Sequence, residues 1–383
     1  MRGSEQHMKF ADAFDLNMGK TPDRDNPLFW ESGVFPWVAI ADIKRDKYIS
    51  DTKEKLPQVA VDKSKIHLVP RGTVLMSFKL SIGKTAITGC DLYTNEAIMA
   101  FEPKQGVDVL PDWLYYYLQR YRWSTNKAVK GQTINKGIIS NAYIDIPSRA
   151  TQEMVADELD RISGIIEDKM QQLVELDRLS QALFIDTFGD PLSNPKRWVM
   201  KKIGDIAHTT SGGTPSKAHS EYYEGGTIPW LRSGEVGQGL IYQTELFITQ
   251  VGLDNSSAKI VPVDTVSIAM YGATVGEVGI IKSPMCTNQA ICNIFPNEAT
   301  APIFLMYFLK SMKPKFTAVA EGGAQPNISQ TVIKNTSIPL PPIALQQSFA
   351  DKVHFIEEQK ALIQESIKEF ENLLAQRMEF HFA

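Results

Sequence analysis

The residues best suited to chemistry occur in two similar sets about 193 residues apart. The run GKTP at 19–22 returns as GGTP at 212–215, and a polar loop at 130–136 has a counterpart at 322–327. Glycine-rich turns offer main-chain N–H groups, lysines and hydroxyls, which are the groups that contact phosphate. Arg, Lys, Asn and Gln side chains can read base edges in the major groove. We therefore expect DNA contacts from Lys20, Lys79, Lys84, Lys130, Gln132, Asn135, Lys136, Thr214, Lys217, Arg232, Tyr271, Gln325 and Asn327.

Motifs for catalysis are missing or weak in the sequence. It contains no GxxxxGK[ST] phosphate loop, no GxGxxG turn after a strand, and no Asn/Asp-Pro-Pro-aromatic run of an adenine methyltransferase. A nuclease-like pattern pairs Pro22-Asp23 with Asp51-Thr52-Lys53, but the second copy has Pro215-Ser216 at the first position. We therefore expect no catalytic residue and no cofactor bound by this chain.

The cysteines and histidines do not suggest a metal site. The three cysteines, Cys90, Cys286 and Cys292, and the six scattered histidines lack the spacing of metal ligands. We expect reduced, partly buried thiols and no bound metal.

The framework around these residues is also repeated. FWESGVFPW at 29–37 returns as YYEGGTIPW at 222–230, and TNEAI at 94–98 returns as TNQAI at 287–291. So long a period indicates two copies of one domain and not a solenoid of short units. Short β-rich runs broken by Gly and Pro predict strands joined by turns. The aromatic runs at 113–118 and 304–309 predict helices whose rings lie in the core, and base stacking is the alternative. Trp37 and Trp230 are also expected in the core.

Each domain ends in proline, at 144–147 and 338–342, and a heptad pattern follows. Such a seam needs a partner helix, and the other copy is the nearest candidate. If a twofold axis relates the copies, the two helices run antiparallel. About 28 residues would form a rod of roughly 40 Å, close to the roughly 34–36 Å of one DNA turn. Lys169 and Lys360 interrupt the seam. Its apolar residues are Val155, Leu159, Ile162, Ile166, Leu173, Leu176, Phe349, Val353, Ile356, Ile363, Ile367 and Phe370.

Composition and charge fit this organisation. The 383 residues are 43% hydrophobic and 22% charged, with a net charge of −4. Residues 1–148 have a net charge of +3 and residues 191–342 of +2, whereas 149–190 and 343–383 have −6 and −3. A polyanion would therefore meet the domains and be repelled by the segments between them. No apolar run is long enough to cross a membrane and no signal peptide is visible, so we expect a soluble, cytoplasmic protein.

These features predict an α+β fold with two similar mixed α/β domains. Each domain is followed by a long helix, and the two helices pair as an antiparallel coiled coil with pseudo-twofold symmetry. The expected parts are an expression scar at 1–8, a first domain at 9–148, a first helix at 149–187, a second domain at 188–342 and a second helix at 343–383.

With the repeated domains and the proline-led heptad helices in place, nearly the whole chain resembles a specificity subunit of a type I restriction-modification enzyme. The resemblance implies that each domain recognises half of a bipartite double-stranded DNA target and that the helices set the spacer. It also implies two methyltransferase subunits, which use S-adenosylmethionine, and two restriction/translocase subunits, which use ATP and Mg²⁺. Base flipping would belong to the methyltransferase.

Two other functions stay open from the residues alone. The chain could be a stand-alone restriction endonuclease or methyltransferase, which would be active without partners. It could also be a coiled-coil interaction protein without DNA affinity, whose assembly would show no salt-dependent DNA binding.

Overall fold

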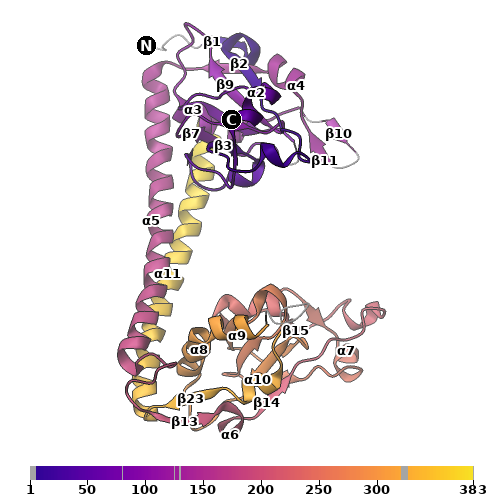
Figure 1. Cartoon of the computed structure of the whole chain (residues 1–383), viewed down its shortest axis with the longest axis vertical. Coiled ribbons are helices and arrows are strands. Elements are labelled where there is room, and N and C mark those ends of the chain that lie inside the picture. Colours follow the sequence, from indigo (N-terminus) through magenta and orange to yellow (C-terminus); the bar gives the residue numbers. More distant parts are fainter. Residues whose placement is uncertain (1–5, 80, 125, 129–130, 321–326, 383) are drawn as a thin grey trace. The chain divides into compact units, whose positions relative to one another are not determined.

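The computed structural model describes residues 6–79, 81–124, 126–128, 131–320 and 327–382. The chain divides into two units: residues 1–170 with 365–383 form unit 1, and residues 171–364 form unit 2. Each unit contains one mixed α/β domain and part of each of two long helices, α5 (Arg149–Phe188) and α11 (Ile343–Phe382) (Figure 1).

The domain of unit 1 is built on a five-stranded sheet with the order β2-β9-β6-β7-β4. Its neighbours are antiparallel except for the parallel pair of β4 and β7. A smaller sheet has the order β5-β3-β8, and β1 pairs with β12 and β10 with β11. The strands are β1 (Gln6–Lys9), β2 (Phe14–Met18), β3 (Phe35–Val38), β4 (Tyr48–Ile49), β5 (Glu54–Leu56), β6 (Val74–Ser77), β7 (Thr85–Thr88), β8 (Tyr93–Thr94), β9 (Ile98–Pro103), β10 (Asn126–Ala128), β11 (Gly131–Thr133) and β12 (Tyr143–Ile146).

The domain of unit 2 repeats this topology. Its five-stranded sheet has the order β14-β22-β19-β20-β16, again with one parallel pair at the β16 edge. A second sheet has the order β17-β15-β21-β18, and β13 pairs with β23 as β1 pairs with β12. The strands are β13 (Val199–Lys202), β14 (Thr209–Ser211), β15 (Ile228–Leu231), β16 (Leu240–Ile241), β17 (Phe247–Ile248), β18 (Ile260–Val261), β19 (Val266–Ala269), β20 (Val278–Ile281), β21 (Met285–Thr287), β22 (Ile291–Ile294) and β23 (Ser337–Leu340).

Short helices connect and cover these sheets. Both predicted aromatic helices are present, as α3 (Pro111–Arg120) and α8 (Pro302–Ser311), and each begins with proline, which suits the first turn. The other helices are α1 (Phe10–Ala13), α2 (Gln58–Ser64), α4 (Lys136–Asn141), α6 (Ile203–Ile206), α7 (Gln250–Asp254), α9 (Lys313–Ala320) and α10 (Gln330–Lys334), with 3-10 turns η1 (Pro27–Phe29), η2 (Ile40–Asp42), η3 (Ser220–Tyr222), η4 (Ser233–Gln238) and η5 (Gly272–Thr274).

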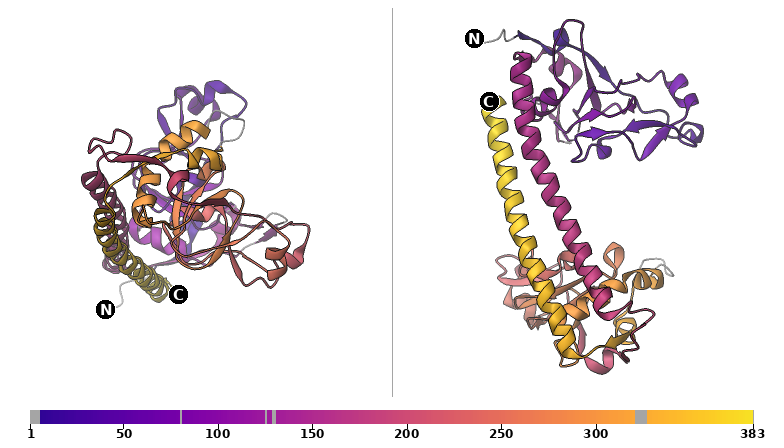
Figure 2. Two further views of the ribbon diagram at one scale, coloured as in Figure 1. Left: turned by 90° about the horizontal axis from the view of Figure 1, so that it is seen from below. Right: turned by 90° about the vertical axis from the view of Figure 1, so that its left-hand side faces the viewer.

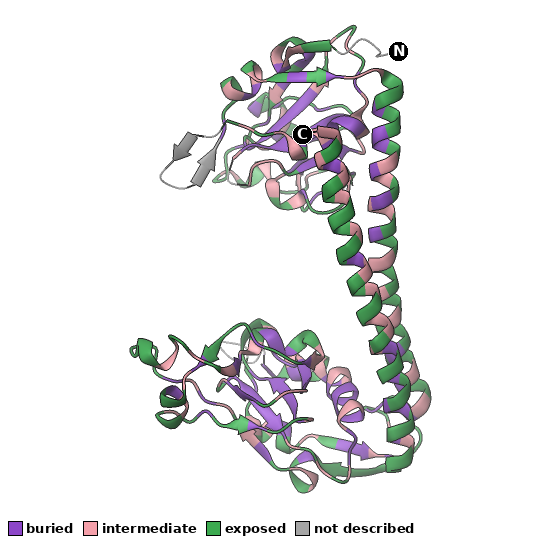
Figure 3. Ribbon diagram, turned by 180° about the vertical axis from the view of Figure 1, so that it is seen from behind, coloured by how far each residue is buried: buried purple, intermediate pink, exposed green. Residues whose placement is uncertain are grey.

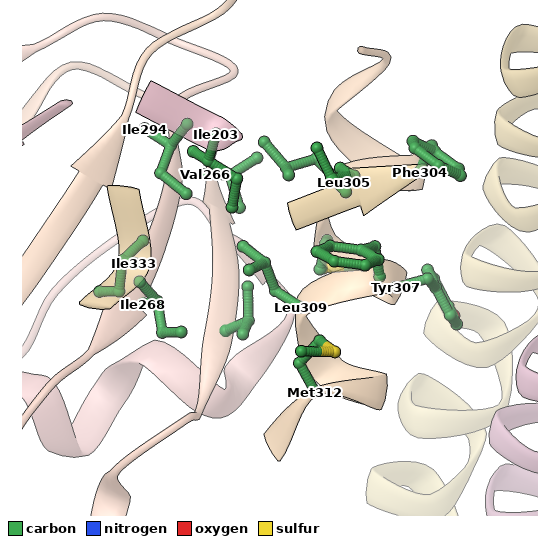
Figure 4. Packing of buried hydrophobic residues seen from close by; sticks show 14 of the residues in the cluster. Ile203, Val266, Ile268, Ile294, Phe304, Leu305, Tyr307, Leu309, Met312 and Ile333 are labelled. Atoms are coloured by element: carbon green, nitrogen blue, oxygen red, sulfur yellow. The ribbon is translucent and has the colours of Figure 1, made fainter. Parts of the chain in front are cut away.

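Aromatic rings fill the core, as predicted. Trp113 and Tyr116 are buried in unit 1, and Phe304 and Phe308 are buried in unit 2. In unit 2, α8 packs one side on the sheet, where Leu305 and Leu309 face it, and the other side on the long helices (Figure 4). Trp37 and Trp230 are also buried, and burial concentrates on the central strands of each sheet (Figure 3).

The long helices pack against each other in antiparallel fashion. In unit 1 the beginning of α5 packs with the end of α11, where Leu159 and Met378 share one cluster. In unit 2 the end of α5 packs with the beginning of α11, through Phe184 and Phe349. Figure 2 shows the two helices running alongside each other within each unit. The antiparallel pairing predicted from the heptads is therefore confirmed.

The seam lies at the predicted positions. Its members nearest the domains are buried, including Val155, Leu159, Phe349 and Val353, whereas Leu173, Leu176, Ile363 and Phe370 are half-buried. The two lysines in the seam are half-buried as well. The Lys360 Nζ lies 2.8 Å from Asp177 and 2.9 Å from Glu357, and the Lys169 Nζ lies 5.7 Å from the centre of the Phe370 ring.

The long helices were expected at 149–187 and 343–383, and each has 40 residues. They extend beyond the paired seam of about 28 residues, and beyond it α5 packs Phe184 and Phe188 in the core of unit 2. One sequence expectation needs correction. The boundary expected at residue 9 lies inside β1, because Gln6 and His7 already pair with β12.

All three cysteines are free, with Cys286 and Cys292 buried. No helix in the described part of the chain is long and apolar enough to cross a lipid bilayer.

Candidate nucleic-acid interface

The repeated glycine turn is a structural joint of each domain. A Cβ on Gly19 would overlap the carbonyl oxygen of Thr94, and a Cβ on Gly212 would overlap that of Thr287. The main-chain N–H of Lys20 donates to Thr94 over 2.8 Å, and that of Gly213 donates to Thr287 over 2.8 Å. The turn therefore requires glycine because two main chains touch there. The repeated TN[EQ]AI segment is its partner.

Hydroxyls and tryptophans complete this joint. Thr21 donates to Glu96, and Thr214 donates to Gln289 in the second copy. The Trp37 indole N–H donates to the carbonyl of Lys20 over 3.1 Å, and the Trp230 indole N–H donates to that of Gly213 over 3.0 Å. The Thr214 hydroxyl, expected to contact DNA, thus has a partner inside the domain.

Charged side chains lie beside the repeated glycine turn of unit 1. Burial acts to raise the pKa of Glu96, but the hydrogen bond from Thr21 and the positive charges of Lys79 and Arg24 lower it overall. The Glu96 carboxylate is therefore ionised and partly neutralised by Lys79. Arg24, which the sequence did not single out, lies 3.8 Å above the centre of the Trp30 ring and pairs with Glu54 at 2.6 Å.

In both units, a loop predicted to contact DNA lies beside the turn that follows a central strand. The main-chain N–H of Ile134 donates to Phe78 over 3.4 Å, and that of Ile328 donates to Met270 over 2.9 Å. In unit 1 this bond ties the residue before Asn135 to the residue before Lys79. In unit 2, Asn327 and Tyr271 form a β-bridge. Of the predicted residues, Tyr271 and Asn327 are therefore paired in unit 2, and Lys79 follows the matching bond in unit 1.

The structure gives other predicted residues local partners. The Asn135 side chain caps α4 by accepting from the N–H of Ile138 over 2.9 Å. The Lys20 Nζ donates to the carbonyl of Ser64 over 2.8 Å. Arg232 forms ion pairs with Glu245 and, at 3.5 Å, with Glu235. DNA contacts by these residues stay a prediction, and each contact would have to replace or share an existing partner.

The remaining predicted residues fall into two groups. Lys84, Lys136 and Lys217 are exposed, and Tyr271 is 43% exposed. Lys130 and Gln325 lie outside the described residues, and of Gln132 only the backbone, within β11, is described.

The nuclease-like residues have structural contacts. Asp51 pairs with Lys55 at 2.9 Å, and the Thr52 hydroxyl accepts from the N–H of Trp37 over 3.0 Å. The matching hydroxyl of Thr244 accepts from the N–H of Trp230 over 3.2 Å, so this part of the pattern belongs to the shared framework. Within the described residues, no three His, Cys, Asp or Glu side chains form a group that could hold a metal ion.

The chain is similar in sequence to specificity subunits of type I restriction enzymes. The MjaIX specificity subunit, a type I restriction enzyme subunit of Methanocaldococcus jannaschii, is 24% identical over 371 residues, which cover 89% of this chain and 84% of the relative. The EcoR124I/EcoR124II specificity subunit of Escherichia coli is 28% identical over 156 residues, 39% of each chain.

Solved structures show the same fold. A chain from a study of complex assembly and conformational transition in the type I restriction-modification system superposes with a TM-score of 0.60 at 16% identity, over 99% of this chain and 97% of that one. The S subunit of the type I system of M. genitalium superposes with a TM-score of 0.52 at 13% identity, over 98% and 95%.

The family model of the type I restriction modification DNA specificity domain matches residues 4–176 and again residues 195–372. The two matches cover both repeats and most of both long helices. The chain therefore belongs to the type I restriction-modification DNA specificity family.

Proposed function

We propose that this chain is the DNA-recognition subunit of a type I restriction-modification complex and that each domain reads one half of a bipartite target. One observation carries the proposal: the two domains share their internal joints and differ at partly exposed positions outside these joints. Trp37 and Trp230 make the same hydrogen bonds, whereas Lys79 is replaced by Tyr271 and Ala39 by Arg232. One fold with two different surfaces suits two different half-sites.

The proposed contacts divide by chemistry. Exposed lysines such as Lys84, Lys136 and Lys217 would contact phosphates, which position the protein without reading sequence. Asn327 and Tyr271 lie together in unit 2, where an amide and a phenol could meet base edges. In unit 1 Lys79 stands at the position that matches Tyr271. The two half-sites should therefore differ in base composition.

The paired helices would set the spacer between the half-sites. Their seam is continuous in heptads, so one heptad added to both helices keeps the pairing and adds about 10 Å. B-DNA rises about 34–36 Å per 10–10.5 base pairs, so the spacer should lengthen by about three base pairs. An insertion in α5 alone would disrupt the seam. An unchanged spacer after the double insertion would contradict the proposal.

The outer faces of the helices support a scaffold role. Phe355 is 62% exposed and Leu362 is 60% exposed on α11, and Val174 is 44% exposed on α5. Large apolar side chains facing solvent suit a partner with an apolar surface. We assign these faces to two methyltransferase subunits, which would in turn recruit two restriction/translocase subunits.

We assign no catalytic step and no cofactor to this chain. S-adenosylmethionine, ATP and Mg²⁺ would bind to the partner subunits. The ion pair of Asp51 with Lys55 supports this assignment, because it gives one acidic residue of the nuclease-like pattern a structural partner. A complex that acts on the chromosome would work in the cytoplasm.

The proposal is tested by co-expressing the chain with its methyltransferase subunit and mapping N6-methyladenine across the host genome. A bipartite methylated motif with a fixed gap is expected. Replacing residues 191–342 with the domain of another family member should change one half of that motif only. A change in both halves would contradict modular reading, and methylation or cleavage by the purified chain alone would contradict the non-catalytic role.

A further inference from the structure

Unit 1 has an open pocket of about 560 Å³ in which three cations meet. We call it the basic pocket. Its positively charged residues are Lys44, Arg45 and Lys84, and the rest of its lining is Ile43, Gly83, Thr85, Tyr115 and Gln119. None of these lining residues is acidic, although Lys44 also borders a neighbouring pocket whose lining includes Asp42, Asp46 and Asp51.

The charges of the basic pocket are available to a ligand. Lys44 and Lys84 are exposed, and no carboxylate in the described part of the chain pairs with either one. Arg45 is 71% exposed and reaches Glu371 at 3.3 Å, a solvent-screened pair that an anion could replace. Lys47 differs, because its Nζ lies 2.6 Å from Asp112 and 2.5 Å from Asp160. Its charge is already neutralised inside the unit.

The neutral lining adds no negative charge. Burial, with smaller contributions from the carboxylates of Asp160, Glu167 and Asp46, raises the pKa of the Tyr115 phenol, so this side chain stays uncharged at neutral pH. These three carboxylates lie outside the lining of the basic pocket. Gly83 has a φ of +85°, and a Cβ there would meet no atom within 4 Å, so the rim is open at this point. An anion can therefore approach the three cations without passing a carboxylate in the lining.

Unit 2 has different residues at the matching positions. The aligned repeats place Gly237 opposite Lys44, Gln238 opposite Arg45 and Glu277 opposite Lys84. These residues are also neighbours, since a Cβ on Gly237 would lie 3.0 Å from Glu277 Oε2. Glu277 already pairs with Lys313 at 2.5 Å. Glu277 of unit 2 therefore occupies the position that Lys84 occupies in unit 1.

We propose that the basic pocket binds one backbone phosphate of the DNA target and that unit 2 lacks this contact. The inference rests on the proposed function, because it takes DNA as the ligand. A phosphodiester carries one negative charge and accepts hydrogen bonds at two oxygens, which two ammonium groups and a guanidinium can share. The contact would anchor unit 1 without reading a base.

The test uses the complex of the full chain with its methyltransferase subunits, a duplex that carries the mapped target, and several salt concentrations. The double variant Lys44→Gln/Lys84→Gln removes two charges. We expect it to bind about tenfold more weakly at physiological salt and to lower the slope of log K against log salt by about 0.9, the value for one phosphate. The loss of affinity caused by the double variant should be the same for targets whose sequence is altered in either half-site.

A matched control removes the same charge elsewhere. Lys352 and Lys368 are exposed on α11, and Lys352→Gln/Lys368→Gln should leave the slope unchanged. Thermal unfolding midpoints of both double variants should match that of the parent, which separates a lost contact from a lost fold. Equal slopes for parent and basic-pocket variant would overturn the inference. Failure of the parent complex to bind its target specifically would instead contradict the proposed function.

Two further measurements locate the contact and exclude a free anion. In a set of duplexes, a single neutral methylphosphonate replaces one phosphate at a time along the target. The replacement at one position beside the first half-site should weaken binding by the parent complex. The same replacement should not further weaken binding by the Lys44→Gln/Lys84→Gln complex. Inorganic phosphate or ATP, added at constant ionic strength, should compete only weakly. If either anion saturates the pocket while the variant keeps the parent slope on DNA, the ligand is a free phosphate and the DNA contact is wrong.

Discussion

Gln152 and Gln346 make the same three hydrogen bonds near the first turns of the two long helices. Gln152 Oε1 accepts from the N–H of Leu110 over 2.6 Å, and its amide donates to the carbonyls of Asp108 and Pro147 over 2.9 and 3.0 Å. Gln346 repeats the set with Ala301, Ala299 and Pro341 over 2.9, 3.1 and 2.9 Å. Both side chains are completely buried. Each glutamine therefore fixes a helix to the domain that precedes it.

Truncating one of these glutamines should destabilise its unit. Gln346→Ala leaves one N–H and two carbonyls without their partner, and each buried polar group left unsatisfied costs about 1–3 kcal/mol. We expect a loss of at least about 2 kcal/mol, measured as a lower urea midpoint for unit 2. The exposed neighbour Gln347 provides the control. Equal effects of Gln346→Ala and Gln347→Ala would show that the hydrogen bonds do not hold the helix.

Phe349 should be far more important for stability than Phe355 on the same helix. The Phe349 ring is buried and lies 5.7 Å from the Phe184 ring, 5.3 Å from Phe188 and 5.4 Å from Tyr307. Phe→Ala in such a core costs about 3–5 kcal/mol through lost burial and a residual cavity. Phe355 is 62% exposed, so Phe355→Ala should stay within about 0.5 kcal/mol. Chemical denaturation of the isolated chain compares the two, and similar losses would contradict this assignment of the core.

Gly212→Ala should disturb the repeated turn of unit 2. The new methyl would overlap main-chain atoms of Thr287 and Asn288, which cannot move without breaking the strand pairing around them. Overpacking of this kind costs about 1–3 kcal/mol. A Cβ on Gly234, in η4, would meet no atom within 4 Å, so Gly234→Ala should change stability by less than about 1 kcal/mol. Hydrogen exchange at β21 reports the difference, and unchanged protection in Gly212→Ala would refute the steric argument.

The heptad seam could be predicted from sequence because burial along a helix follows a short period. Ile162 and Ile356 are buried where the pattern places them. The seam does not reach the end of α5, because Phe184 and Phe188 pack in a domain core and not in the seam. The paired glutamines do carry a sequence signal, since each lies five residues after one of the aligned prolines Pro147 and Pro341.

The basic pocket was less predictable from the sequence than the seam, because its residues come from separate segments. Lys44 and Lys84 lie 40 residues apart in the sequence and meet only when η2 and the β6–β7 turn fold together. Lys20 and Asn135 have side chains of the right type for DNA contact, yet both have local partners. Residue type indicates what a side chain can bind, but the fold decides whether its hydrogen-bonding groups are already used.

The cluster of Glu158, Arg377 and His381 should make the helix pair of unit 1 sensitive to acid. Arg377 donates two hydrogen bonds to Glu158, and His381 Nε2 lies 2.8 Å from Glu158 Oε2. The hydrogen bonds from Arg377 and His381 lower the pKa of Glu158 to about 2. Because this value lies below that of the unfolded chain, about 4.3, the contribution to stability is complete above about pH 4.3 and is lost as the pH falls toward about 2.

Glu158→Gln should therefore lower the thermal midpoint at neutral pH, but by less than Gln346→Ala does, since the ion pair of Glu158 with Arg377 is partly solvated. The difference in thermal midpoint between Glu158→Gln and the parent protein should vanish as the pH approaches the lowered pKa of Glu158. Glu167→Gln, at an exposed position of the same helix, should have no such pH-dependent effect, and a constant difference for Glu158→Gln across this range would contradict the role of the carboxylate.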